Sequence, residues 1–190
     1  AGLTGPKAHP GKYYVRLSVG ESSLTESFEI LKDKRSMSSK DDLKEQFEFL
    51  IGIRDKVTDI HRAIKQIRST RDQLNSLNGK LDDSHEEISN SIKDVVNRIT
   101  EIEENLYQTK NRSGQDPLNF PIRLNNKLAH LSSVSGRGNF RPTDQMYGVR
   151  DELVELIDLE LKKWNKIKES ELDKINAMIL ENNIQLISIK

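Results

Sequence analysis

The chain of 190 residues contains no cysteine, few aromatic residues and no excess of charge of either sign. Without cysteine, neither disulfides nor thiolate metal sites can form, although this does not fix the cellular compartment. Aromatic residues make up only 5% of the chain, so we expect no broad stacking platform for bases or sugars. The 30 basic and 30 acidic residues cancel, whereas nucleic-acid binding needs a basic excess on one face. We therefore expect no nucleic-acid partner.

The sequence also lacks long apolar runs. No run approaches the roughly 20 apolar residues of a membrane-spanning helix, so we expect no membrane span. Residues 1–6 carry neither the charged segment nor the apolar segment of a signal peptide. The chain opens with Ala1 rather than methionine, and we expect it to be a piece of a longer protein or a processed product.

The most prominent feature is an apolar seam, in which apolar residues recur every three or four positions. This spacing predicts amphipathic helices, and Asn78-Gly79 marks a tight turn between two of them. The seam consists of Leu43, Phe47, Leu50, Ile53, Val57, Ile60, Ile64, Ile67, Leu74, Leu77, Leu81, His85, Ile88, Ile92, Val95, Ile99, Ile102 and Leu106. We expect two long antiparallel helices, because short connections join antiparallel neighbours.

The first helix is expected to begin at Ser39 and to end near Leu77. A hydroxyl at Ser39 and a carboxylate at Asp42 resemble a capping box, which satisfies free backbone N–H groups at a helix start. Gly52 lies inside this helix, where it costs about 1 kcal/mol relative to alanine. A close helix–helix crossing is the expected reason for a glycine there.

The second helix is expected to start between Asp82 and Ser84, with Ser84 and Glu87 as its capping box, and to end near Lys110. A shorter helix is predicted over about 120–134, with Pro121 in its first turn. Proline is tolerated there because the missing N–H would have no partner within the helix.

A third long helix is predicted after Thr143, which has the hydroxyl of a capping residue. Ser170 with Asp173 predicts a further cap, and hence a separate last helix that ends near Leu180. Apolar and polar residues alternate over Ile184–Ile189, which predicts a short strand.

Residues 1–35 predict a β-hairpin. A first strand alternates apolar and polar residues, a turn follows at 20–23, and a second strand comes after it. The apolar positions are Tyr13, Val15, Leu17, Val19, Leu24, Phe28 and Ile30. A lone hairpin is marginally stable in water. It must therefore either pack on the helices or form the last two strands of a sandwich, and we favour the sandwich.

The predicted fold is mainly α: an elongated antiparallel helical bundle, with three long helices plus shorter ones, and an N-terminal β-hairpin. We expect two domains, with the hairpin over 1–35 as the end of an Ig-like domain and the bundle over 36–190.

No pattern in the chain predicts catalysis, a metal site or a cofactor. The histidines, His9, His61, His85 and His130, lack metal-ligand spacing. A first acidic group matches a helix N-terminus rather than a calcium loop: Asp82, Asp83, Glu86 and Glu87. A second matches a solvated helix face rather than the shielded pair of a glycosidase: Asp151, Glu152, Glu155 and Asp158.

The least ordinary local sequence is Asp116–His130, which combines two prolines with Arg123, Asn125 and Asn126. Asparagine is a poor choice inside a helix, so side-chain hydrogen bonds to neighbouring segments are the favoured explanation. The alternative is that Arg123, Asn125 and Asn126 contact a ligand or a partner.

Several segments resemble the C-terminal region of bacterial sortilin-like proteins. These segments are Pro10–Val19, Lys32–Arg35, Gln46–Phe47, Ile53–Lys56, Ile64–Arg68, Asp116–Leu131, Pro142–Tyr147 and Leu161–Trp164. The segment 116–131 is the most specific, and the resemblance extends over nearly the whole chain. In that family a small Ig-like β-domain and a helical region follow a β-propeller of BNR (Asp-box) repeats, often labelled glycosyl hydrolase.

The resemblance implies an exported bacterial parent, periplasmic or secreted, whose hydrolase chemistry would lie in the propeller. No Asp-box motif occurs in this chain, so no catalytic residue is carried over. The chain's partners would be the propeller and Ig-like domains of its own parent.

These observations together predict a non-catalytic C-terminal accessory module. The alternative is a coiled-coil scaffold that binds a partner or forms a homodimer, with the seam continuing across an interface. The least favoured alternative is an enzyme that uses the region of Arg123–Asn126.

Overall fold

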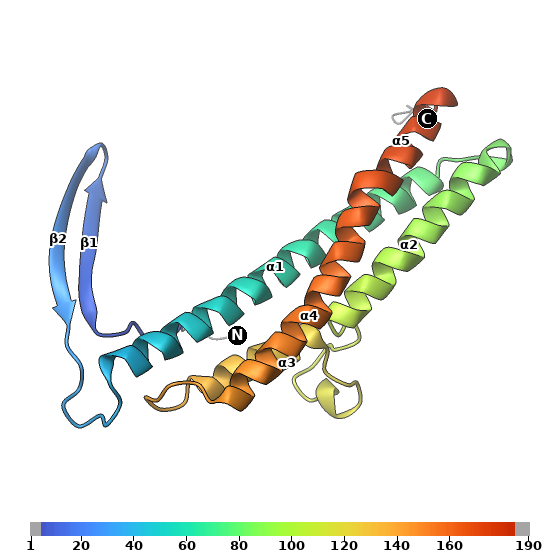
Figure 1. Ribbon diagram of the computed structural model, residues 1–190. Helices are drawn as coiled ribbons and strands as arrows, with labels where there is room; N and C mark the ends of the chain where they lie inside the picture. The colour runs from blue at the N-terminus through green and yellow to red at the C-terminus, as the bar shows by residue number, and fades with distance from the viewer. Residues whose placement is uncertain (1–4, 185–190) are drawn as a thin grey trace. The chain divides into compact units, whose positions relative to one another are not determined.

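The computed structural model describes residues 5–184, and within them the chain is mainly helical with an N-terminal β-hairpin, as predicted (Figure 1). Strands β1 (Gly11–Val19) and β2 (Ser22–Ile30) precede the helices α1 (Lys40–Asn78), α2 (Glu86–Leu106), α3 (Leu124–Ser135), α4 (Asp144–Lys166) and α5 (Leu172–Glu181). The structure divides into two compact units. The first unit contains the described residues up to Asp55 together with Ala129–Arg150. The second contains Lys56–Leu128 together with the described residues from Asp151 onward.

The hairpin forms as its alternation predicts. β1 and β2 pair antiparallel from Gly11 opposite Ile30 to Val19 opposite Ser22, which leaves a two-residue turn at 20–21 (Figure 1). Gly20 has a φ of 59°, and a glycine with positive φ at the first turn position suits the right-handed twist of a hairpin. The register places each apolar residue of β1 on the same face as its partner in β2.

The predicted start of α1 is confirmed. The backbone N–H of Asp42 donates to Ser39 Oγ over 3.0 Å, and the backbone N–H of Ser39 donates to Asp42 Oδ2 over 2.8 Å. Aspartate thus takes the place that glutamate has in a standard capping box. The hydrogen bond from the Ser39 hydroxyl, with that from the Ser39 N–H, lowers the pKa of Asp42.

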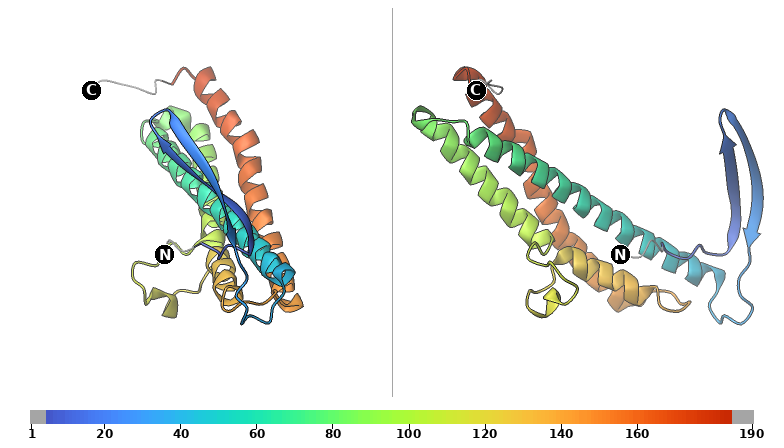
Figure 2. Two further views of the ribbon diagram at one scale, coloured as in Figure 1. Left: turned by 90° about the vertical axis from the view of Figure 1, so that its left-hand side faces the viewer. Right: turned by 180° about the vertical axis from the view of Figure 1, so that it is seen from behind.

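In the second unit, helices bury the seam among themselves. The part of α1 from Lys56 onward lies beside α2, and the chain from Asp151 through α5 completes the core (Figure 2). The buried apolar residues there are Ile60, Ala63, Ile64, Ile67, Leu74, Ile88, Ile92, Val95, Ile99, Ile102, Leu106, Leu128, Leu153, Ile157, Trp164, Ile167, Ile175 and Ile179. Polar contacts also join these helices: Lys56 Nζ lies 2.7 Å from Asp158 Oδ1, and Trp164 Nε1 donates to Gln66 Oε1 over 3.2 Å.

The first unit has a small core around Phe49, Leu50 and Ile53. The ring of Tyr147 meets Phe49 edge-on, with 5.0 Å between ring centroids. The buried Gln46 side chain donates to the carbonyl of Ser135 over 2.8 Å, which links α1 to the end of α3.

Two predicted boundaries of α2 are wrong. Asp82, rather than Ser84, provides the cap: it accepts a hydrogen bond from the Ser84 N–H at the start of a short 3-10 turn, Asp83–His85. At the other end, α2 stops at Leu106, because Tyr107 is extended. Tertiary contacts hold the chain away from the helix there, since Gln108 Nε2 donates to the Pro121 carbonyl over 2.7 Å.

The start of the next helix also differs from the prediction. α3 begins at Leu124, so Pro121 lies outside it, and a short 3-10 turn at Asp116–Leu118 comes before it. Asp116 organises this loop by accepting hydrogen bonds from the backbone N–H groups of Arg112 and Ser113. These bonds, that from Arg112 first, lower the pKa of Asp116.

The separate cap predicted at Ser170 does not form. The Ser170 hydroxyl instead donates back to the Lys166 carbonyl over 2.8 Å, and Ile167–Glu171 forms a π turn that joins α4 to α5 without a break (Figure 2). Back-bonding of this kind disturbs the regular i→i−4 pattern of a helix. The predicted start of α4 is correct, because the Met146 N–H donates to Thr143 Oγ1 over 3.3 Å. The strand predicted at Ile184–Ile189 lies, except for Ile184, outside the described residues.

The close crossing expected at Gly52 is not observed. A Cβ atom built on Gly52 would meet nothing within 4 Å, and the same holds for Gly148 in α4. Both glycines therefore carry the entropic cost of glycine in a helix without a packing reason.

We expect Gly52→Ala to raise the free energy of unfolding by about 0.5–1 kcal/mol, because alanine loses less backbone entropy in a helix. Urea unfolding followed by circular dichroism at 222 nm would measure the change. Gly20→Ala is the matched control, and it should destabilise the hairpin because Gly20 has a positive φ. A loss of stability in Gly52→Ala would show that the site is sterically restricted after all.

Candidate functional site

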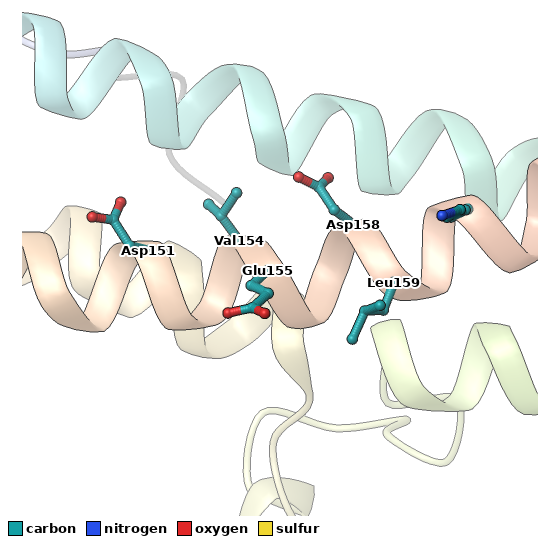
Figure 3. Close-up of a pocket in the computed structure, with 6 residues that line it drawn as sticks. Asp151, Val154, Glu155, Asp158 and Leu159 are labelled. Atoms are coloured by element: carbon teal, nitrogen blue, oxygen red, sulfur yellow. The ribbon is translucent and has the colours of Figure 1, made fainter.

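The acidic residues of α4 lie on an open helix surface, where Asp151, Glu155 and Asp158 line one pocket together with Val154, Leu159 and Lys162. Figure 3 shows the carboxylates of Glu155 and Asp158 directed away from each other along α4, with Val154 and Leu159 flanking the pair. Asp158 is ion-paired with Lys56, and the acidic side chains at 151, 152, 155 and 158 are all exposed. A glycosidase pair instead places one acid in a shielded position facing the other.

The acidic residues near 82–87 act at a helix end, as predicted. Asp82 Oδ1 accepts hydrogen bonds from the N–H and the hydroxyl of Ser84 and lies 2.8 Å from Nδ1 of His85. Hydrogen bonding from Ser84 first, and then from His85, lowers the pKa of Asp82. Among residues 5–184, no group of three or more histidine and acidic side chains could hold a metal ion. No helix in the described part of the chain is long and apolar enough to cross a membrane.

The three candidate contact residues lie in and just before the first turn of α3, with different exposures. Asn125 is buried, so its side chain faces the interior rather than a surface. Arg123 and Asn126 are half-buried. The carbonyl of Arg123 accepts the N–H of Lys127 over 3.0 Å, which is the first backbone hydrogen bond of the helix. A ligand or partner contact there stays a prediction for Arg123 and Asn126.

An ion cluster around a buried carboxylate, between α1 and α2, was not predicted from the sequence. The carboxylate of Glu103 is only 2% exposed, and its oxygens accept hydrogen bonds from Arg68, over 2.6 Å, and from Arg71. The guanidinium of Arg68 also lies over the Tyr107 ring, 5.4 Å from its centroid. One signal could have found the cluster: Arg71 occupies a seam position between Ile67 and Leu74. Both carboxylate oxygens of Glu103 are already bound by arginines of the same chain, so the cluster is suited to holding α1 and α2 together.

One face of the hairpin is apolar and is uncovered over most of its length, and we call it the hairpin face. It consists of Tyr13, Val15, Leu17, Val19, Leu24, Phe28 and Ile30. The opposite face carries Lys12, Tyr14, Arg16, Ser18, Ser23, Thr25, Ser27 and Glu29, which are mostly polar. A sheet with one apolar and one polar face normally packs the apolar face against a core.

Coverage of the hairpin face decreases toward the turn. Near the strand ends, Tyr13 stacks on Phe28 with 5.9 Å between centroids, and its hydroxyl donates to the His9 carbonyl over 2.7 Å. The His9 ring in turn lies edge-on to Phe47 of α1, at 5.3 Å. Beyond this point the side chains are open: Val15, Leu17, Val19 and Leu24 are 55–71% exposed. The hairpin face is thus anchored at its base and uncovered over the rest of its length.

Both outer edges of the hairpin are also open. The sheet has two strands only, so the outward N–H and C=O groups of β1 and β2 have no strand beside them in the described structure. Open edges accept further strands readily. The hairpin can therefore be extended at its edges and covered on its face.

No protein-family model, curated protein or solved structure matches this chain. The hairpin face is therefore the feature of the described chain that most directly indicates a function.

We expect Glu103→Ala to lower the free energy of unfolding by about 1.5–3 kcal/mol, because Arg68 and Arg71, which are partly exposed, lose a charged hydrogen-bond partner. Urea unfolding at neutral pH would measure the loss. Glu101→Ala is the matched control: it is an exposed residue of the same helix and should change stability by less than about 0.5 kcal/mol. Equal effects of the two substitutions would rule out a stabilising role for the cluster.

Proposed function

We propose that the chain is a non-catalytic accessory module of a larger, sortilin-like propeller protein of glycosyl-hydrolase type. In this proposal the hairpin supplies strands to a β-domain of that protein, and the helices form a structural support beside it. The parent would be exported, and its propeller would hold any hydrolytic site. The observation that carries the proposal is the hairpin face, which is apolar, regular and uncovered.

The stability of hairpins supports this proposal. Two isolated strands are marginal in water, whereas three or more strands over an apolar face are stable. The hairpin face exposes several large apolar side chains side by side, and contiguous patches of this kind usually mark interaction sites. Adding strands at the open edges and a second sheet over the face would satisfy both features.

The helices offer less to a partner than the hairpin does. Most of the seam is buried within the chain; Ile53, Ile60, Ile67, Ile92 and Ile99, for example, are almost fully inaccessible. A coiled-coil scaffold would need seam residues left open for another chain. This burial favours the accessory module over the seam-driven scaffold.

We expect the purified chain to release no chromophore from aryl glycosides or aryl sialosides at protein concentrations up to about 10 μM. At this concentration, a catalyst with a typical turnover number would give a clear signal. The reason is that the candidate acids of α4, at 151, 152, 155 and 158, are all exposed, whereas a glycosidase needs one shielded acid. Turnover that a single substitution, such as Asp158→Asn or Glu155→Gln, abolishes would overturn the non-catalytic assignment.

We expect Leu17→Ser with Leu24→Ser to change the helical unfolding free energy of the 190-residue chain by less than about 0.5 kcal/mol, because both side chains are exposed. In the product of the complete reading frame that encodes this chain, the same two substitutions should lower the free energy of unfolding several times more. There, the side chains of Leu17 and Leu24 would be buried, and the substitutions would remove that apolar contact. Thermal and urea unfolding of the two proteins would measure the contrast. Ser18→Ala with Ser23→Ala, on the polar face, is the control. An equally small effect in both proteins would contradict the proposed function.

A further inference from the structure

One charged residue interrupts the hairpin face. Glu26 lies directly opposite Val15, between Leu24 and Phe28 along β2. Residues directly opposite each other, and residues two apart along a strand, share a face, so Glu26 projects on the apolar side. Glu26 is exposed, and in the part of the chain that the structure describes its carboxylate makes no ion pair or side-chain hydrogen bond.

The charges of the opposite face are arranged differently. Lys12 lies directly opposite Glu29, so this face carries a cation beside an anion in the register, and Lys12 Nζ lies 5.5 Å from the centroid of the Tyr14 ring. Arg16 Nε donates to the hydroxyl of its partner Thr25 over 3.3 Å. This face is exposed, mostly polar and carries both signs of charge, so it is suited to water. Glu26 is therefore the one charge of the two strands that lies on the side to be covered.

The position of Glu26 restricts what can cover the hairpin face. A carboxylate taken out of water without a cation is strongly disfavoured. A second copy of this chain packed face to face by a two-fold axis would bring the same apolar face, and with it a second Glu26, into the same layer. Such a copy offers no cation on that face to compensate either carboxylate. Charge complementarity therefore disfavours a homodimer and favours a different sheet.

We propose that the hairpin face is covered by a β-sheet that is apolar except for one lysine or arginine, and that this cation pairs with Glu26. The proposal rests on the proposed function, because the covering sheet would belong to the β-domain of the parent protein. It adds the chemistry of the contact: apolar side chains meet Val15, Leu17, Leu24 and Phe28, and a single ion pair fixes the register of the two layers. A polar group inside an apolar layer specifies register because every other alignment leaves it unpaired.

The test compares amide hydrogen exchange in the 190-residue chain with that in the product of the complete reading frame. In the longer protein we expect the amides of 13–28 to exchange about 100-fold more slowly. Glu26→Lys should speed this exchange about tenfold more than Glu26→Gln does, because it places like charges together. Changing the facing cation to glutamate should restore protection to Glu26→Lys. Glu21→Lys, in the exposed turn, controls for the change in net charge.

The possible outcomes separate the two proposals. Equal exchange of the hairpin amides in both proteins would overturn the proposed function and this inference together. Slow exchange with equal effects of Glu26→Lys and Glu26→Gln would overturn the ion pair while the accessory role stands. Protection in the 190-residue chain that grows with its concentration would show that a second copy covers the face, and would also overturn the inference.

Discussion

Burial of an isoleucine-rich stripe is the interaction on which the helical part of this protein depends. Isoleucine has one strongly preferred rotamer in a helix, so a stripe of isoleucines loses little side-chain entropy on packing. Each buried side chain contributes about 1.5–3 kcal/mol of transfer free energy. The stripe runs along α1, α2 and the chain from α4 to α5, and in the second unit most of its members are almost fully buried. The helices remain long because this burial repeats at every turn.

The predictable parts of the fold are those set by local pattern. The start of α1 follows from a hydroxyl and a carboxylate three residues apart, and the hairpin follows from alternation around Gly20. The unpredicted parts depend on contacts between distant residues. α2 ends early because Gln108 reaches the carbonyl of Pro121, and Ser170 bonds backward instead of capping forward. The apolar residues of the hairpin were visible in the sequence, whereas their exposure was not, because exposure depends on what the rest of the chain covers.

In the described part of the chain, charged side chains form ion pairs in the second unit, whereas the one on the hairpin face does not. In the second unit, two groups of charges are paired across helices: Glu103 lies between two arginines, and Arg98 donates to both oxygens of Glu171 over 2.5 and 2.7 Å. The hairpin leaves Glu26 alone on its apolar side. These pairs hold the helices of the second unit together, whereas the uncompensated charge of Glu26 marks the hairpin face as a surface for contact. The candidate residue Arg123 also has a buried Nε atom without a hydrogen-bond partner in the described structure, and the same is true of Asn125 Oδ1.

The π turn at Ile167–Glu171 has a consequence for how the chain can vary in length. The N–H of Leu172 bonds to the carbonyl of Ile167, five residues back, so this turn holds one residue more than an α turn. Removing one residue here would leave a regular helix, with Trp164 and Ile175 still directed into the core. A deletion elsewhere in α4 or α5 would rotate every later side chain by about 100°. The π turn is therefore the place in this long helix where a single-residue deletion is structurally neutral.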